Sequence, residues 1–111
     1  MTQSFDWQET LALAQHNDAL ANELLSLLQG TLETHRNVFQ AALAEDDHAM
    51  MQREAHKLYG ACCYVGVPKL RQLTAAADQL EITEESTLVE LTHQIIAEID
   101  HLLSEVFNEQ S

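Results

Sequence analysis

The sequence predicts an all-α fold, an up-and-down antiparallel four-helix bundle with a short extra helix at its N-terminal end. Only 3 glycines and 1 proline interrupt the 111 residues, which favours long helices over many short strands. Leucine and isoleucine recur at intervals of three and four residues, the spacing of helices that bury one face. No repeat or linker divides residues 1–111, so we expect a single domain.

The short N-terminal helix is predicted to begin after Asp6. Asp6 and Glu9 have the spacing of a capping box, in which each side chain accepts a hydrogen bond from the backbone N–H of the other residue. The helix then continues through Trp7 and Leu11. Together with Phe5, these two residues are expected to leave an apolar rim at one end of the bundle, open to a partner.

The second predicted helix is more than twenty residues long, with Asn17 or Asp18 as its N-cap. Its apolar residues repeat at helical intervals and are expected to face the core. They are Leu20, Leu24, Leu27, Leu28, Leu32, Val38, Phe39 and Leu43. The helix ends at the acidic turn of residues 45–47.

The third helix is predicted to begin with Asp46 or Asp47 as its N-cap and to run to about Val65. Gly66 is expected to take the left-handed conformation that ends many helices, because glycine has no Cβ to oppose it. Pro68 prevents the helix from continuing.

The fourth and fifth helices complete the bundle. The apolar face of the fourth consists of Leu70, Leu73, Ala77 and Leu80. After the polar connection of residues 82–86, one last helix repeats Leu88, Leu91, Ile95, Ile99, Leu102 and Val106. Each stripe is one buried face, so four such helices pack most simply as an antiparallel bundle.

Charge and composition exclude several classes of function. With 5 Lys+Arg against 18 Asp+Glu, the net charge of −13 repels nucleic acid and anionic lipid. The first residues lack the features of a signal peptide and no apolar run approaches ~20 residues, so we expect a cytoplasmic location. Cys62 and Cys63 are neighbours and a ring between them is strained, so both are expected to be thiols.

The third helix carries one histidine on the face opposite its apolar stripe. The stripe consists of Met51, Ala55, Leu58, Cys62 and Val65. At about 100° per residue, His56 lies about 140° from Met51 and Gly60 about 180° from it. His56 is therefore expected to face solvent beside the nearly bare surface of Ala49 and Gly60, where a bulky partner has access to the imidazole.

Four of the five basic residues lie close to His56 in the sequence. They are Arg53, Lys57, Lys69 and Arg71, and Glu54 is the one acid between positions 53 and 71. We expect a basic island around His56 that holds the oxygens of a phosphoryl group. A neutral imidazole is a competent nucleophile for phosphorus, whereas the chain has no nucleotide-binding loop with which to use ATP itself. The pattern thus indicates phosphoryl transfer.

The run His56-Lys57-Leu58-Tyr59-Gly60-Ala61-Cys62-Cys63-Tyr64-Val65-Gly66 resembles the histidine phosphotransfer (HPt) domains of multistep two-component phosphorelays. Their signature has a glycine four residues after the histidine and a second glycine six residues later, which matches Gly60 and Gly66. Leu70, Leu73 and Leu80-Glu81 match downstream. The run from Gly60 to Pro68 and the pair Asp6-Trp7 look most like the C-terminal module of hybrid sensor kinases of the BarA/GacS type.

This resemblance implies a phosphocarrier and not an enzyme with a nucleotide site of its own. His56 would accept a phosphoryl group at Nε2 from the aspartate of one receiver domain and pass it to another, with Mg²⁺ supplied by the receiver. Gly60 and Cys63 would give access to the imidazole. Because Tyr59 stands where the family often has lysine, stabilisation of the phosphate is expected to fall on Lys57 and Arg53.

The remaining expectations concern partners and alternatives. We expect Lys69, Arg71 and Trp7 to help dock the receiver, and the domain to be a monomer without a cofactor of its own. A helical adaptor that binds receivers without carrying phosphate is the alternative function. A thiol-based redox or zinc site at Cys62 and Cys63 is a weaker alternative, because adjacent cysteines are poorly spaced for one tetrahedral metal.

Overall fold

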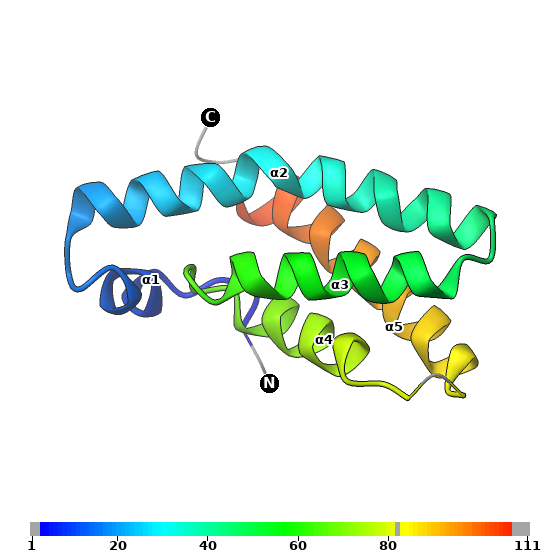
Figure 1. Ribbon diagram of the computed structural model, residues 1–111. Coiled ribbons are helices and arrows are strands. Elements are labelled where there is room, and N and C mark those ends of the chain that lie inside the picture. The colour runs from blue at the N-terminus through cyan, green and yellow to red at the C-terminus, as the bar shows by residue number, and fades with distance from the viewer. Residues whose placement is uncertain (1–2, 82, 108–111) are drawn as a thin grey trace.

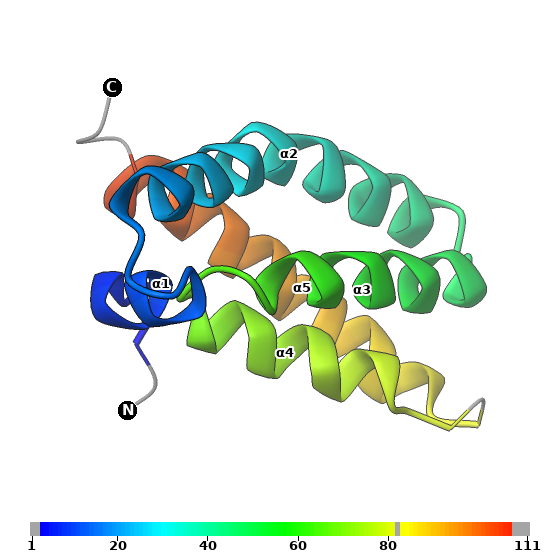
Figure 2. The same cartoon turned by 60° about the vertical axis from the view of Figure 1, so that its left-hand side comes forward.

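The computed structural model describes residues 3–81 and 83–107, and in this part of the chain the predicted helical bundle is confirmed (Figures 1 and 2). The elements are α1 (Trp7–Leu13), α2 (Asp18–Ala44), α3 (His48–Cys62), α4 (Pro68–Asp78), α5 (Glu85–His101) and a π-helical turn, Leu102–Val106. Helices α2 to α5 alternate in direction, and α1 lies at the end of the bundle where α2 begins (Figure 1).

The core lies between α2, α3, α4 and α5, and α3 packs against the other three helices. The predicted apolar stripe of α3 is confirmed, because each of its five members is at most 1% exposed. The largest buried side chains are Phe39, Leu32, Met51, Leu58, Leu70, Ile95, Ile99 and Leu102. This packing fixes the rotation of α3 about its axis and therefore the direction of the opposite face.

The predicted core face of α2 is only partly right. Leu27 is 62% exposed and Leu20 is 38% exposed, although both were expected to be buried. The residues that α2 buries are Ala21, Leu25, Leu28, Leu32, Phe39 and Ala42. Helix α2 has more leucines than its one buried face can hold, so some of them remain on the surface.

Side-chain caps begin the first three helices. Asn17 accepts a hydrogen bond from the backbone N–H of Leu20 at 3.0 Å, and Asp47 accepts one from Met50 at 3.0 Å. These contacts select Asn17 and Asp47 from the predicted pairs of N-caps. In α1 only half of the predicted capping box forms, because Asp6 accepts from the N–H of Glu9 at 3.1 Å but its own N–H donates to Gly66.

The connection between α3 and α4 differs from its prediction. Helix α3 ends at Cys62, and Gly66 does not have a positive φ, so the predicted left-handed cap is wrong. A Cβ atom on Gly66 would lie 2.1 Å from the carbonyl oxygen of Asp6 and 2.8 Å from Oγ1 of Thr10. The glycine is required because the N-terminal segment passes directly against this backbone.

The last helix also departs from its prediction, which was one uninterrupted helix through Val106. After His101 the chain widens into the π-helical turn Leu102–Val106. The turn brings Phe107 into the core at 7% exposure, while Val106 is only half-buried. The ring of Phe107 meets that of Phe5 edge to face, with 5.5 Å between centroids, and so attaches the N-terminal segment to the end of the bundle.

Arg71 joins three parts of the chain. Its Nη1 donates to the carbonyl oxygens of Cys62 at 3.2 Å and Val65 at 3.4 Å, just where α3 ends. Its Nη2 contacts both carboxylate oxygens of Glu9, at 2.9 and 3.0 Å. The guanidinium thus satisfies carbonyl groups that have no partner inside α3 and holds α1 against the α3–α4 connection.

Replacing Arg71 with Met is expected to lower the free energy of unfolding by about 2 kcal/mol, because it removes the hydrogen bonds that the charged guanidinium makes to Glu9 and to the carbonyls of Cys62 and Val65. Urea denaturation followed by circular dichroism measures the change. The control is Lys57→Met, which removes one positive charge from an exposed position and should alter stability by less than about 0.5 kcal/mol. Equal effects of the two substitutions would contradict the structural role of Arg71.

Candidate functional site

His56 lies on the surface of α3, and its side chain is 72% exposed, as the helical spacing predicted. The imidazole sits in an open groove between α3 and the C-terminal end of α4. The groove is lined by Ala49, Gln52, Arg53, His56, Asp78 and Leu80. Because α3 buries its opposite face completely, the position of this histidine is fixed by the core of the bundle.

Asp78, the last residue of α4, contacts the ring of His56. Its Oδ2 lies 3.1 Å from Nδ1 of the imidazole. A carboxylate only accepts hydrogen bonds, so Nδ1 carries the proton in this contact, and the lone pair of the neutral ring is at Nε2. Sequence reasoning missed Asp78, because it follows His56 by 22 positions in a different helix and no local spacing links the two.

Gln52 holds the end of α4 in place. Its Nε2 lies within hydrogen-bonding distance of three carbonyl oxygens, those of Ala77 at 3.2 Å, Asp78 at 3.3 Å and Leu80 at 2.9 Å. The last carbonyls of a helix have no partner within the helix, so an amide donor is suited to cap them. Gln52 lies one turn before His56, and α3 therefore positions both the imidazole and the backbone that carries its carboxylate partner.

The surface beside His56 is open on the side of Gly60. Gly60 is exposed, and a Cβ added there would have no atom of the described chain within 4 Å, apart from the helix's own neighbouring backbone. Cys63 is half-buried. Hydrogen bonding to the Cys63 side chain raises the pKa of Tyr59, the residue that stands where the family often has lysine, so these two side chains are partners of each other.

The four predicted basic residues do not surround His56 together. Arg53 lines the groove and Lys57 is exposed next to the histidine. In contrast, Nζ of Lys69 lies 3.7 Å from a carboxylate oxygen of Glu98 on α5, and Arg71 binds Glu9. The predicted basic island is therefore wrong for two of its four residues. Arg53 and Lys57 lie beside His56, whereas Lys69 and Arg71 of α4 contact α5 and α1 instead.

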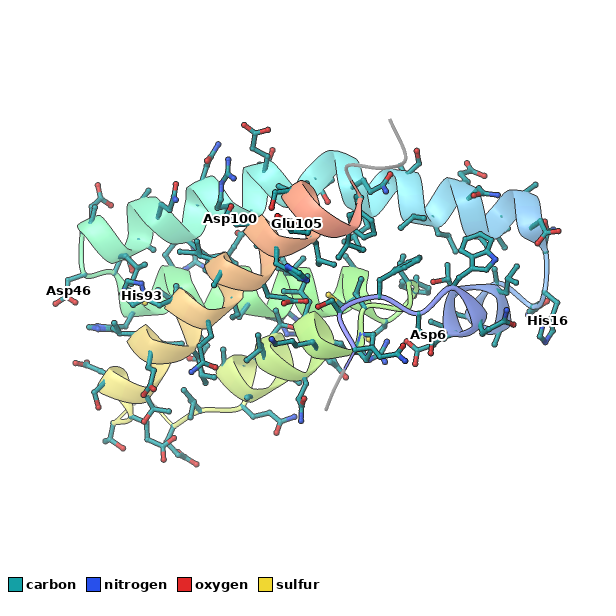
Figure 3. All side chains as sticks on the ribbon, turned by 180° about the vertical axis from the view of Figure 1, so that it is seen from behind. Asp6, His16, Asp46, His93, Asp100 and Glu105 are labelled. Carbon is teal, nitrogen blue, oxygen red and sulfur yellow. The ribbon has the colours of Figure 1, made fainter. Side chains whose placement is uncertain are left out.

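The other histidines have different surroundings. Nδ1 of His35 on α2 lies 2.5 Å from Oε2 of Glu54, a buried carboxylate of α3 that does not line the His56 groove. Figure 3 shows His16 at the connection between α1 and α2, and His93 toward the other end of the molecule on α5. Neither of these two lies in a groove that also holds Arg53 and Asp78.

A second groove, apolar in character, runs between α2 and the end of α3. It is lined by Leu24, Leu27, Leu28, Thr31, His35, Ala61, Tyr64 and Val65. Leu27 and Tyr64 are each 62% exposed, the two most exposed large apolar side chains of the described residues. This surface was not predicted, because Leu27 was assigned to the core. Trp7, predicted to help form a docking rim, is only partly exposed and packs against the core.

The described residues offer no reactive cysteine pair, metal site or membrane-spanning helix. Both cysteines are free, and burial raises the pKa of the Cys62 thiol to about 12, which keeps it unreactive at neutral pH. Within residues 3–81 and 83–107, no three His, Cys, Asp or Glu side chains are arranged as a metal site. Among the helices described, none has the length and hydropathy needed to span a membrane.

Comparison with known proteins adds independent information. Residues 23–109 match the family model described as "Hpt domain". The chain is 34% identical over 97 residues to the sensor histidine kinase GacS of Pseudomonas protegens, covering 84% of this chain and 11% of the kinase. It is 30% identical over 104 residues to the signal transduction histidine-protein kinase BarA of Shigella flexneri, covering 92% of this chain and again 11% of the relative.

The fold has a solved counterpart. The crystal structure of the HPT domain of a sensor hybrid histidine kinase from Shewanella superposes with a TM-score of 0.66 at 29% identity. The superposition covers 92% of this chain and 95% of that domain. The chain thus spans nearly all of one solved domain but only about a tenth of the length of the kinases it matches.

Proposed function

The chain belongs to the Hpt domain family, which gives it a phosphotransfer role in a phosphorelay, and we propose that His56 is the residue that carries the phosphoryl group. One observation supports this choice above the others. His56 combines a 72% exposed imidazole with a carboxylate at Nδ1, which leaves Nε2 as the free nucleophile.

The proposed reaction exchanges one phosphorus bond for another. The lone pair of His56 Nε2 attacks the phosphorus of an aspartyl phosphate on a receiver domain, the N–P bond forms, and the bond between phosphorus and the carboxyl oxygen breaks. The receiver regains its carboxylate, and the imidazole becomes a phosphoimidazolium that keeps its proton on Nδ1. A carboxylate of a second receiver then attacks the phosphorus, and the electron pair of the N–P bond returns to Nε2.

The chain's own contribution is to present the imidazole and to stabilise charge. Arg53 and Lys57, both exposed beside His56, supply positive charge for the phosphoryl oxygens, and the open surface at Gly60 admits the receiver. Mg²⁺ comes with the receiver, and the domain acts as a carrier without a nucleotide site of its own. We place it in the cytoplasm, where two free thiols such as Cys62 and Cys63 persist.

We propose that the receiver also contacts the apolar groove between α2 and α3. Tyr64 lies two residues after the end of α3, the helix that carries His56, and Ala61 of that helix also lines the groove. A standard interface covers about 800 Å² on each partner, which is wide enough to include both the imidazole and this groove. Exposed apolar residues such as Leu27 and Tyr64 are typical of the centre of an interface.

Replacing Leu27 with Ser is expected to weaken receiver binding about tenfold, because an apolar anchor at the centre of an interface contributes more than about 1 kcal/mol. Isothermal titration of the receiver into each variant measures this. The control is Leu13→Ser, which removes another exposed leucine, 42% exposed, that does not line the groove. Equal affinities for the wild type and Leu27→Ser would place the receiver elsewhere, with Trp7, Lys69 and Arg71 as the remaining predicted docking residues.

The phosphotransfer proposal is tested by mixing the chain with a panel of receiver domains precharged with acetyl phosphate. Intact-protein mass spectrometry should then show one acid-labile phosphoryl group on the chain in the presence of its cognate receiver. A receiver that binds tightly but never transfers phosphate, across the whole panel, would instead support the adaptor function.

A further inference from the structure

We propose that Asp78 is a positioning residue that makes phosphorylated His56 a fast phosphoryl donor, by keeping a proton on Nδ1 of the imidazole. This inference rests on the proposed phosphotransfer function and goes beyond it, because it assigns control of the reaction rate to a residue on another helix. The contact that supports it is the 3.1 Å approach of Asp78 Oδ2 to His56 Nδ1.

The rate of the second half of the reaction depends on its leaving group. When Nδ1 is protonated, cleavage of the N–P bond releases neutral imidazole, which is a good leaving group. When Nδ1 has lost its proton, the same cleavage must release an imidazolate anion, which is far less stable in water. A negative carboxylate that accepts a hydrogen bond from Nδ1 favours the protonated ring and therefore the faster reaction.

The surroundings of the imidazole leave Asp78 as the acid that can act in this way. Two charged side chains line the groove together with His56, Asp78 from α4 and Arg53 from α3. Lys57 follows the histidine on the same helix. Among the described residues, α2 and α5 contribute no side chain to the groove. Arg53 and Lys57 are positive and oppose a proton on the ring, so Asp78 is the group that favours it.

The backbone around Asp78 is held in place by hydrogen bonds from Gln52. The side chain of Asp78 is 29% exposed, which is well below the exposure of His56, and Gln52 binds backbone carbonyls on both sides of it, those of Ala77 and Leu80. A carboxylate at a frayed helix end would sample many positions. Here the amide of Gln52, one turn before His56, holds the end of α4 so that the carboxylate stays at Nδ1.

The test uses chemically phosphorylated protein, so that no receiver is needed. Potassium phosphoramidate transfers its phosphoryl group to histidine and releases ammonia, and ³¹P NMR follows the loss of the phosphohistidine signal between about pH 5 and 10. The signal of His56 is identified by its absence in His56→Gln. Wild type is compared with Asp78→Asn, which keeps a hydrogen-bond acceptor but removes the charge, and with Glu81→Gln, which removes one nearby charge outside the groove.

We expect the fall of the hydrolysis rate with rising pH to move to lower pH in Asp78→Asn, so that above neutral pH its phosphohistidine lives about fivefold longer. Transfer to a receiver should slow by a similar factor. Gln52→Ala, which keeps Asp78 but frees the end of α4, should shift the profile in the same direction by less. Glu81→Gln should keep the wild-type profile.

The possible results distinguish a failure of the role of Asp78 from a failure of the proposed phosphotransfer function. Identical pH profiles for the wild type and Asp78→Asn would overturn the role of Asp78 and leave His56 as the phosphate carrier. An equal shift in Glu81→Gln would overturn it as well, because the effect would then be one of net charge. No His56 signal in the wild type, and no transfer from any receiver, would overturn the proposed function and this inference together.

Discussion

The substitution His56→Gln is expected to abolish phosphoryl transfer to the chain, with at least about a thousandfold loss of labelling rate. Glutamine keeps a polar side chain of similar reach, but its amide nitrogen has no lone pair available to attack phosphorus. Intact-protein mass spectrometry with the cognate receiver precharged with acetyl phosphate measures the loss. The side chain is 72% exposed, so the stability of the domain should change by less than about 0.5 kcal/mol.

The matched control for this experiment is His93→Gln. His93 is an exposed histidine of α5 (Figure 3), and it does not line the groove that holds His56. This variant should be labelled at the wild-type rate. Labelling that persists in His56→Gln and disappears in His93→Gln would move the phosphorylation site, whereas persistence in both would point to one of the other histidines.

The largest effect on stability is expected from Gly66→Ala, which should lower the free energy of unfolding by about 3 kcal/mol. The added methyl group would lie 2.1 Å from the carbonyl oxygen of Asp6, and that oxygen belongs to backbone which cannot simply rotate away. The clash would also strain the 2.8 Å hydrogen bond from the N–H of Asp6 to the Gly66 carbonyl. Urea denaturation measures the change, and retention of wild-type stability would contradict the close packing of the N-terminal segment.

Gly60→Ala provides the contrast within the same stretch of chain. Apart from the helix's own neighbouring backbone, no atom of the described residues lies within 4 Å of the added Cβ, and Gly60 is inside α3, so alanine should stabilise the helix by up to about 1 kcal/mol. The free energy of unfolding measured by urea denaturation should therefore fall in Gly66→Ala and rise in Gly60→Ala. If open access at Gly60 matters to the receiver, Gly60→Ala should slow transfer even though it stabilises the fold.

Much of the site was predictable because it depends on one helix alone. The rotation of α3 follows from the spacing of Met51, Ala55 and Leu58, and that spacing also placed His56 and Gly60 on the solvent face. All of this was confirmed. The capping residue Asp47 was also predictable from the sequence, since a cap is a contact between residues three positions apart.

The errors arose where two distant segments meet. Gly66 was predicted to be a left-handed helix cap. The structure instead requires glycine there because the backbone of Asp6, sixty positions away in the sequence, leaves no room for a Cβ. Arg71 was assigned to the basic island around His56 and to receiver docking, although Glu9 and the end of α3 bind it. Leu27 was assigned to the core because the periodicity of α2 does not reveal how many of its leucines the neighbouring helices can cover.

The sequence by itself determined the helices, the buried face of α3 and the exposure of His56, because each follows from hydrophobic spacing and capping within a short stretch of chain. Only the tertiary structure decided which groups surround that imidazole. The contact of Asp78 with Nδ1 depends on how α4 is placed along and around α3, and Gln52 holds it there through bonds between residues more than twenty positions apart. Such placement is set by the packing of all the helices together, which no local pattern encodes.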